Sequence, residues 1–196
     1  PDVYDGAPTV FTSFMATIVK AAGFIAFITI FSSQSKALGY TWELVLSFVI
    51  ISTLLVGNIV AVFQRSVKRM LAYSSIAQAG FMLFALYGKS SFAQEAIVLY
   101  AVVYSLATIG VFGVLIKMKE NSFEAFNGLA KANPLLAFVT TIFLFSLAGI
   151  PLTGGFFAKY YMLNALYAAG AGLWLIIIAI LFAAVSVYYY FKLRCT

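Results

Sequence analysis

Two lysines lie inside long apolar runs and are the side chains in this sequence best suited to chemistry. Lys20 lies near the middle of one run, and Lys159 ends the sequence Ser146-Leu-Ala-Gly-Ile-Pro-Leu-Thr-Gly-Gly-Phe-Phe-Ala-Lys159 within another. Burial disfavours the charged form of a lysine, so a buried lysine can alternate between its two protonation states. A lysine at the centre of a bilayer costs about 2.5–3.5 kcal/mol and typically marks an ion or proton route. We therefore predict a proton relay at Lys20 and Lys159.

The stretch before Lys159 contains residues that interrupt helices, namely Gly149, Pro151, Gly154 and Gly155. Proline removes a backbone donor, and opened backbone survives at membrane depth only where it lines protein or water. Broken helices place backbone dipoles and charged groups beside a hydrated cavity in many transporters. A simple kink without chemistry is the alternative, but the lysine that follows favours a functional break.

Hydroxyl and amide side chains recur at about one-turn spacing in three apolar runs: Ser13 and Thr17 before Lys20, then Ser74 and Gln78, then Tyr100, Tyr104 and Thr108. On a regular helix the first pair shares a face with Lys20 and could hold water beside its ammonium group. Such stripes also serve hydrogen bonding between helices. We therefore treat them as candidates for a polar path, with helix packing as the alternative.

Other kinds of chemistry lack the residues that they need. The chain has no histidine, and its single cysteine, Cys195, is interpreted as an ordinary thiol near the membrane surface. No carboxylate accompanies the two lysines at membrane depth. Haem, iron–sulfur clusters and metal ions have no ligand set here, and no nucleophile is paired with a base. We expect no catalytic, cofactor-binding or metal-binding residues in this chain.

The elements that must position these residues are transmembrane helices. Hydrophobic residues make up 64% of the chain and charged residues 9%, with a mean hydropathy of +1.04, outside the range of soluble domains. The apolar runs are too long and too uniform for membrane strands. We predict an all-α, polytopic helix bundle in a single membrane domain, residues 1–196, with six spans at about 9–31, 43–63, 70–88, 95–117, 134–166 (broken near 149–155) and 173–192.

The net charge of +6 reflects membrane topology rather than nucleic-acid binding, because the basic residues flank the predicted spans. One side of the membrane receives Lys36 and Lys89, whereas the side of the N-terminus receives Arg65, Lys68, Arg69, Lys117, Lys119, Lys131, Lys192 and Arg194. This asymmetry predicts that both ends lie inside. Trp42 and Trp174 open two spans at the opposite interface, which agrees with that orientation.

The first residues, from Pro1 to Pro8, form a turn-rich stretch without a basic leader, so no cleavable targeting segment is expected. The absence of an initiating methionine suggests a piece of a longer chain.

Three motifs together resemble the antiporter-like membrane subunits of respiratory complex I, the NADH:quinone oxidoreductase. They are Pro1-Asp-Val-Tyr-Asp-Gly-Ala-Pro-Thr9 leading to Lys20, Lys68-Arg-Met-Leu-Ala-Tyr-Ser-Ser-Ile-Ala77, and Ser146-Leu-Ala-Gly-Ile-Pro151 through Lys159. They occur in family order over nearly the whole chain. The first motif and the lysine in the broken helix favour the subunit N (subunit 2) group over subunit M, which has a glutamate there.

The resemblance implies part of an inverted-repeat, antiporter-like fold, with this chain corresponding to the eighth through thirteenth of fourteen helices. Lys20 would be the central relay lysine and Lys159 the lysine of the second broken helix. Gln78 stands where the family usually has a histidine, so it could act only through hydrogen bonds or bound water.

The resemblance also implies proton translocation in an energy-transducing membrane, bacterial or mitochondrial, with further membrane subunits of complex I as partners. NAD, FMN, iron–sulfur clusters and quinone would be held by those other subunits. A subunit of a multisubunit cation/proton antiporter is the second hypothesis. A membrane module without conduction is the third.

Overall fold

The chain is represented by a computed structural model that describes residues 2–87, 91–170 and 172–193, without the side chains of residues 32–40 and Ser91. Within these ranges all regular elements are helices, and the only extended pairing is an isolated bridge between Ser66 and Ser122. The predicted all-α helical bundle is thereby confirmed. Lys89, Arg194 and Cys195, and the side chain of Lys36, lie outside the described residues.

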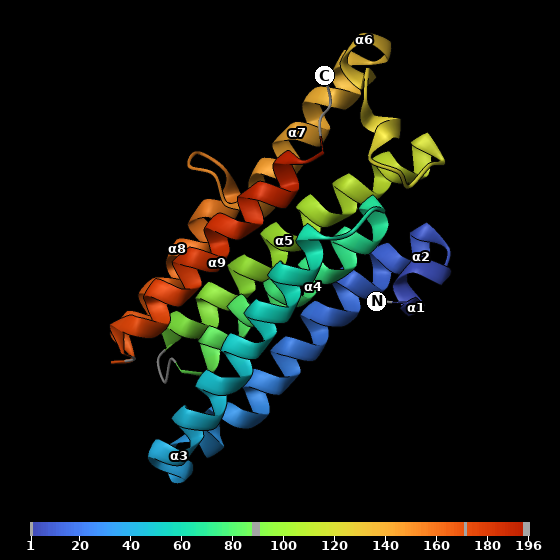
Figure 1. Cartoon of the computed structure of the whole chain (residues 1–196). Coiled ribbons are helices and arrows are strands. Elements are labelled where there is room, and N and C mark those ends of the chain that lie inside the picture. Colours follow the sequence, from blue (N-terminus) through green and yellow to red (C-terminus); the bar gives the residue numbers. More distant parts are fainter. Residues whose placement is uncertain (1, 88–90, 171, 194–196) are drawn as a thin grey trace.

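The helices follow in the order α1 (Asp2–Gly6), α2 (Thr9–Phe14), the π-helical segment η1 (Met15–Val19), α3 (Lys20–Val62), α4 (Val67–Met82), the 3₁₀ turn η2 (Leu83–Leu86), α5 (Ser91–Met118), η3 (Glu124–Phe126), α6 (Leu129–Ala132), α7 (Pro134–Ala148), α8 (Gly154–Ala168) and α9 (Leu173–Phe191). Figure 1 shows most of them running side by side along one axis.

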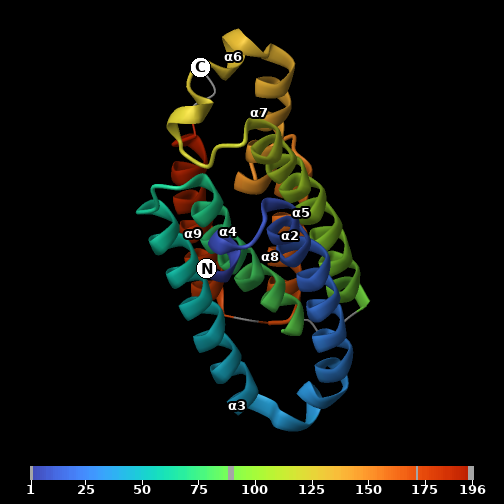
Figure 2. The same ribbon diagram turned by 90° about the vertical axis from the view of Figure 1, so that its right-hand side faces the viewer.

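Four segments in the described part of the chain are long and apolar enough to cross a membrane: Thr9–Phe31, Thr41–Val62, Phe92–Met118 and Leu173–Phe191. Helix runs without a break through the first two, from α2 and η1 into α3, but Figure 2 shows α3 turning back on itself to form two arms. The remaining bundle helices are shorter. Helix α4 with η2 reaches about 30 Å, the thickness of the hydrocarbon layer, and α7 and α8 are the two halves of an interrupted segment.

The bundle packs around α4, which lies against α3, while α5 lies against α7 and α8, and α9 against α3 and α7. Small residues allow the closest approach. A Cβ atom added to Gly57 on α3 would collide with the backbone of Ala77 on α4. Membrane helices use such small contacts to bring backbones and polar groups together. This contact fixes the rotation of α4 against α3 and so determines which neighbouring helices its polar residues face.

The short helix α1 is held against the start of α4. Lys68 is only 3% exposed, and its Nζ donates to the carbonyls of Asp5 (2.9 Å) and Ala7 (2.5 Å). Arg69 forms ion pairs with Asp2 (3.2 Å) and Asp5 (3.9 Å). Lys68 is one of the basic residues that predict topology, and the structure also gives it a local role, as the donor to carbonyls near the end of α1.

Candidate proton-relay site

Lys20 begins α3 directly after the π-helical segment Met15–Val19. It is half-buried, and its Nζ donates to the carbonyl of Ser75 on α4 at 2.6 Å. A π turn holds more residues than an α turn, so the regular spacing predicted for Ser13, Thr17 and Lys20 does not apply here. The Thr17 hydroxyl donates to the Ser13 carbonyl at 2.7 Å within its own helix. The structure therefore joins Lys20 to α4.

Lys159 lies in the second turn of α8 and is 7% exposed. Its Nζ donates to the carbonyls of Ala148 (2.7 Å) and Leu147 (3.2 Å) and lies 3.5 Å from Ser186 Oγ. The ammonium is also 5.2 Å from the centre of the Phe81 ring. Since the last carbonyls of a helix lack partners within it and carry its negative dipole end, they are favourable acceptors for a cation.

Those carbonyls are free because Gly149 ends α7 in the left-handed conformation, at φ 82°. The backbone N–H of Gly149 and Ile150 returns to the carbonyl of Phe145 at 2.9 and 3.0 Å, which closes the end of the helix. The Ser146 carbonyl also accepts from the Gly149 N–H, at 3.1 Å, and the last two carbonyls of the helix, of Leu147 and Ala148, are left for Lys159. The break and the lysine thus form one hydrogen-bonded unit.

The interruption is narrower than the sequence suggests. It runs over residues 149–153, and the predicted breakers Gly154 and Gly155 form the first turn of α8 instead. A helix N-terminus tolerates glycine, and here close approach requires it at Gly155: a Cβ atom would collide with the Ser146 carbonyl. The Gly155 N–H donates to Ser146 Oγ at 3.1 Å. This contact clamps the two halves together.

Gln78 on α4 reaches the same break. Its Nε2 donates to the Leu147 carbonyl at 3.1 Å, and to the Tyr190 hydroxyl at 3.4 Å. Its Oε1 accepts from the hydroxyl of Tyr100 on α5. Ser74, one turn earlier on α4, forms a hydrogen bond with the same Tyr190 hydroxyl. Both polar residues predicted on this helix therefore join one buried network.

A small cavity lies between α4, α5, α7 and α8, with Gln78, Tyr100, Tyr104, Gly155 and Lys159 among its lining residues. The Tyr104 hydroxyl faces Ser75 and Thr108, but neither it nor the Thr108 hydroxyl has a hydrogen-bond partner within the described part of the chain. A buried hydroxyl without a partner costs about 1–3 kcal/mol. Water between Ser75, Tyr104 and the cavity would remove that cost.

The predicted residues thus fall into one connected region, because Lys20 bonds to Ser75 and Lys159 shares a partner with Gln78, one turn further along α4. Several members of the network were not predicted: Asn58, Ser186, Tyr189 and Tyr190. Tyr189 donates to Asn58 Oδ1 at 3.4 Å. For two of these residues the sequence does hold a signal, because Ser186 and Tyr190 are one helical turn apart on α9.

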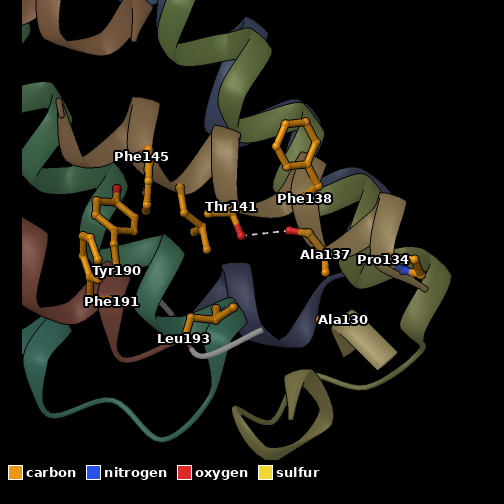
Figure 3. Close-up of a pocket in the computed structure, with 10 residues that line it drawn as sticks. Ala130, Pro134, Ala137, Phe138, Thr141, Phe145, Tyr190, Phe191 and Leu193 are labelled. Atoms are coloured by element: carbon orange, nitrogen blue, oxygen red, sulfur yellow. Dashed lines mark hydrogen bonds between the residues drawn. The ribbon is translucent and has the colours of Figure 1, made fainter. Parts of the chain in front are cut away.

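A larger, mostly apolar hollow lies between α6, α7 and the end of α9 (Figure 3), where the Tyr190 ring separates it from this network. Phe138, Phe145 and Phe191 line it, and the hydroxyl of Thr141 is bonded to the Ala137 carbonyl at 2.8 Å. This groove presents hydrocarbon and no free polar group, so it is unsuited to carrying protons.

Neither relay lysine has a carboxylate partner among residues 2–87, 91–170 and 172–193, where the ion pairs are those of Arg69. The described residues contain no group of three or more His, Cys, Asp or Glu side chains arranged to hold a metal ion. Protonation of Lys20 or Lys159 therefore places a charge that backbone carbonyls, hydroxyls and an aromatic ring must accommodate.

Comparisons with known proteins give the wider context of this arrangement. A family model described as "NADH:quinone oxidoreductase/Mrp antiporter, TM" matches residues 1–186. NADH-quinone oxidoreductase subunit N 2 of Rhizobium meliloti is 40% identical over 98% of this chain, and the protein of the same name from Solibacter usitatus is 41% identical. The chain spans about two fifths of the length of these relatives, 41% and 40%.

Solved structures agree on the fold. A chain of respiratory complex I from Thermus thermophilus with bound aureothin matches with a TM-score of 0.83 and 38% identity, over 98% of this chain and 43% of that one. A chain of the Mrp complex from Dietzia matches with a TM-score of 0.80 at 22% identity, over 94% of this chain and 35% of that one, which shows a shared fold. The resemblance read from the three motifs is confirmed: this multi-pass membrane chain belongs to the NADH:quinone oxidoreductase/Mrp antiporter transmembrane family.

Proposed function

We propose that the chain forms part of a proton-translocating membrane subunit of an NADH:quinone oxidoreductase and that Lys20 and Lys159 relay the protons. The observation that carries the proposal is Lys159, a buried lysine held on the open carbonyls of a broken helix, with no carboxylate partner among the residues that the structure describes. Lys68 is also buried on carbonyls, but those lie at the end of the short helix α1, whereas Lys159 lies beside a small cavity inside the bundle. This placement would let Lys159 gain and lose its proton.

The polar groups between the two lysines support a path along α4. From Lys20 it would follow Ser75 and the Tyr104 hydroxyl into the small cavity that Lys159 lines. The Tyr104 hydroxyl has no partner in the described part of the chain, which favours a bound water at this step. Thr108 would extend the water site. Ser13 and Thr17 lie at the Lys20 end, where their side chains are buried.

The charge of each lysine would alter the proton affinity of the other, so an electrostatic or conformational change arriving from a neighbouring subunit would drive protons stepwise. The relatives are named as subunits of an NADH-quinone oxidoreductase. We accordingly propose other membrane subunits as partners, with NAD, FMN, iron–sulfur clusters and quinone bound there, and an energy-transducing membrane with the N-terminus of this piece inside.

The test is Lys159→Ala in the full-length protein within its native complex. In membrane vesicles energised with NADH, we expect a lower ratio of protons pumped to electrons transferred. Lys131→Ala, which removes an exposed lysine at the end of α6, is the matched control and should pump normally. An unchanged proton-to-electron ratio in assembled Lys159→Ala complexes would overturn the relay role.

Cation/proton exchange is the second candidate, because the family model covers Mrp antiporters and the Dietzia Mrp complex shares the fold. Purification in mild detergent followed by mass spectrometry separates the two. Recovery with flavin- and iron–sulfur-containing subunits supports the first function. Recovery with antiporter subunits alone, together with sodium- or potassium-dependent pH changes without NADH, supports the second.

A further inference from the structure

We propose that Gln78 is a positioning residue for Lys159: its amide shares the Leu147 carbonyl with the lysine and thereby favours the neutral state of Lys159. This inference rests on the proposed relay function. It assigns to Gln78 the control of a neighbouring proton carrier and no transfer of its own.

The orientation of the amide is determined by its surroundings. Oε1 accepts from the Tyr100 hydroxyl, and Nε2 donates to the Leu147 carbonyl at 3.1 Å. A turned amide would place Oε1 against that carbonyl, two acceptors facing each other. The Tyr190 hydroxyl adds a second contact to Nε2, at 3.4 Å, and is itself bonded to Ser74. Helices α5, α7 and α9 therefore hold the amide in a single orientation.

This orientation acts on Lys159 through one oxygen atom. Leu147 O receives the N–H of Gln78 at 3.1 Å and the ammonium of Lys159 at 3.2 Å. The amide competes with the ammonium for the Leu147 carbonyl, and it directs the positive end of its own dipole toward the ammonium. Both effects cost more when Lys159 carries a charge. Gln78 therefore disfavours protonated Lys159.

The other groups around Lys159 carry no charge that would mask the effect of Gln78 on its protonation. Tyr100 and Tyr104 on α5 line the cavity with Lys159, and Tyr190 on α9 reaches it through Gln78. Phe81 on α4 and Ser186 on α9 complete the contacts. No carboxylate of the described residues pairs with the lysine. The surrounding titratable groups are phenols, which are neutral near pH 7. None of them offsets the effect of the amide on the charge of protonated Lys159.

The experiment measures the pH dependence of NADH-driven pumping in vesicles that contain the assembled complex with Gln78→Leu or Gln78→Glu. Gln78→Leu removes the competing donor, so Lys159 should hold its proton to higher pH and the profile should move to alkaline pH. Gln78→Glu adds an opposite charge and should move it further, by about 1–3 pH units. A role in packing alone would lower the amount of complex and leave the profile of the remainder unchanged.

Tyr100→Phe keeps the inference testable if the Gln78 variants fail to assemble. It keeps the ring, removes the donor that orients Oε1, and should move the profile in the same direction by less. Tyr161→Phe, an exposed phenol on α8, is the control and should keep the wild-type profile. Wild-type profiles in all assembled variants would overturn the inference. Normal pumping by Lys159→Ala would instead overturn the relay itself, so the two failures are distinguishable.

Discussion

The charge of Lys159 depends on the way helix α7 ends. Gly149 leaves the helical path, the carbonyls of Leu147 and Ala148 lose their partners, and the ammonium takes their place. The lysine is therefore solvated by the main chain of its own segment. Such solvation can stabilise a charge in the membrane without a carboxylate partner among the described residues, as the proposed relay requires.

At this scale, Gly149→Ala should impair both stability and pumping. The residue has a φ of 82°, and an added Cβ atom would lie 2.8 Å from Lys159 Cδ. We expect a loss of about 1–3 kcal/mol of stability from the left-handed backbone and the collision, together with reduced NADH-driven pumping. Thermal unfolding in detergent and vesicle assays would measure the two effects.

Gly128→Ala is the matched control, because Gly128 has a similar φ of 79° and open space around its Cβ position. It should lose stability through backbone strain of about 1–2 kcal/mol and pump normally once assembled. Equal pumping by the two variants would contradict a functional contact between Gly149 and Lys159.

Two of the departures from regular α-helix each precede one of the lysines proposed as relays. The π-helical segment Met15–Val19 directly precedes Lys20, and the interruption at residues 149–153 precedes Lys159. Both displace backbone from its usual pairing, and such departures cluster at functional sites. The interruption is readable in the sequence from its glycines and proline. The π turn is not, because Met15–Val19 contains ordinary apolar residues and a threonine.

A third element depends on a buried charge, since Lys68 binds the last part of α1 through two carbonyls. In Lys68→Met those acceptors lose their partner, and we expect α1 to detach locally, with faster hydrogen exchange over residues 2–7. A hydrogen bond to a charged group contributes about 1.5–3 kcal/mol, so exchange should accelerate by at least tenfold.

Arg69→Gln provides the comparison, because its ion pairs with Asp2 and Asp5 are exposed. Exposed pairs contribute about 0–1 kcal/mol, so exchange in this variant should change little. If exchange in Lys68→Met equals that of the wild type, α1 is held by other contacts.

The two ends of the bundle are formed by different segments of the chain. The N-terminal segment, the chain after α3 and the chain after α5 meet at one end, where Val67 N–H donates to Asn121 O at 2.8 Å and Lys192 Nζ to Gln64 O at 3.1 Å. The turn of α3 lies at the other end (Figures 1 and 2). The basic residues described at the first end predict that this end is inside.

Cysteine labelling checks that orientation in a variant with Cys195→Ser. We expect Asn127→Cys to react with a membrane-impermeant maleimide in inside-out vesicles and to be protected in intact cells. Ala169→Cys, between α8 and α9, should show the reverse pattern. Both positions are exposed in the structure. The opposite result for the pair would invert the predicted topology.

Composition and apolar run length were sufficient to predict a helical membrane bundle, because the bilayer imposes one length and one polarity on every spanning helix. For the same reason, the sequence predicts that Lys20 and Lys159 are the charges at membrane depth. The position of the break was predicted to within a few residues. Its end was placed too late, because Gly154 and Gly155 form the first turn of α8, where they allow close packing against α5 and α7 and do not open the backbone.

The partners of those residues depend on tertiary structure. Lys20 meets Ser75, Gln78 meets Leu147, and Ser74 meets Tyr190, all between different helices. Periodicity identifies neighbours on one helix, whereas the rotation of one helix against another is set by contacts such as Gly57 on Ala77. Two of the acceptors are backbone carbonyls, which every residue carries and no residue type reveals. The two lysines could therefore be found in the sequence, but their hydrogen-bond acceptors are determined by how the helices pack.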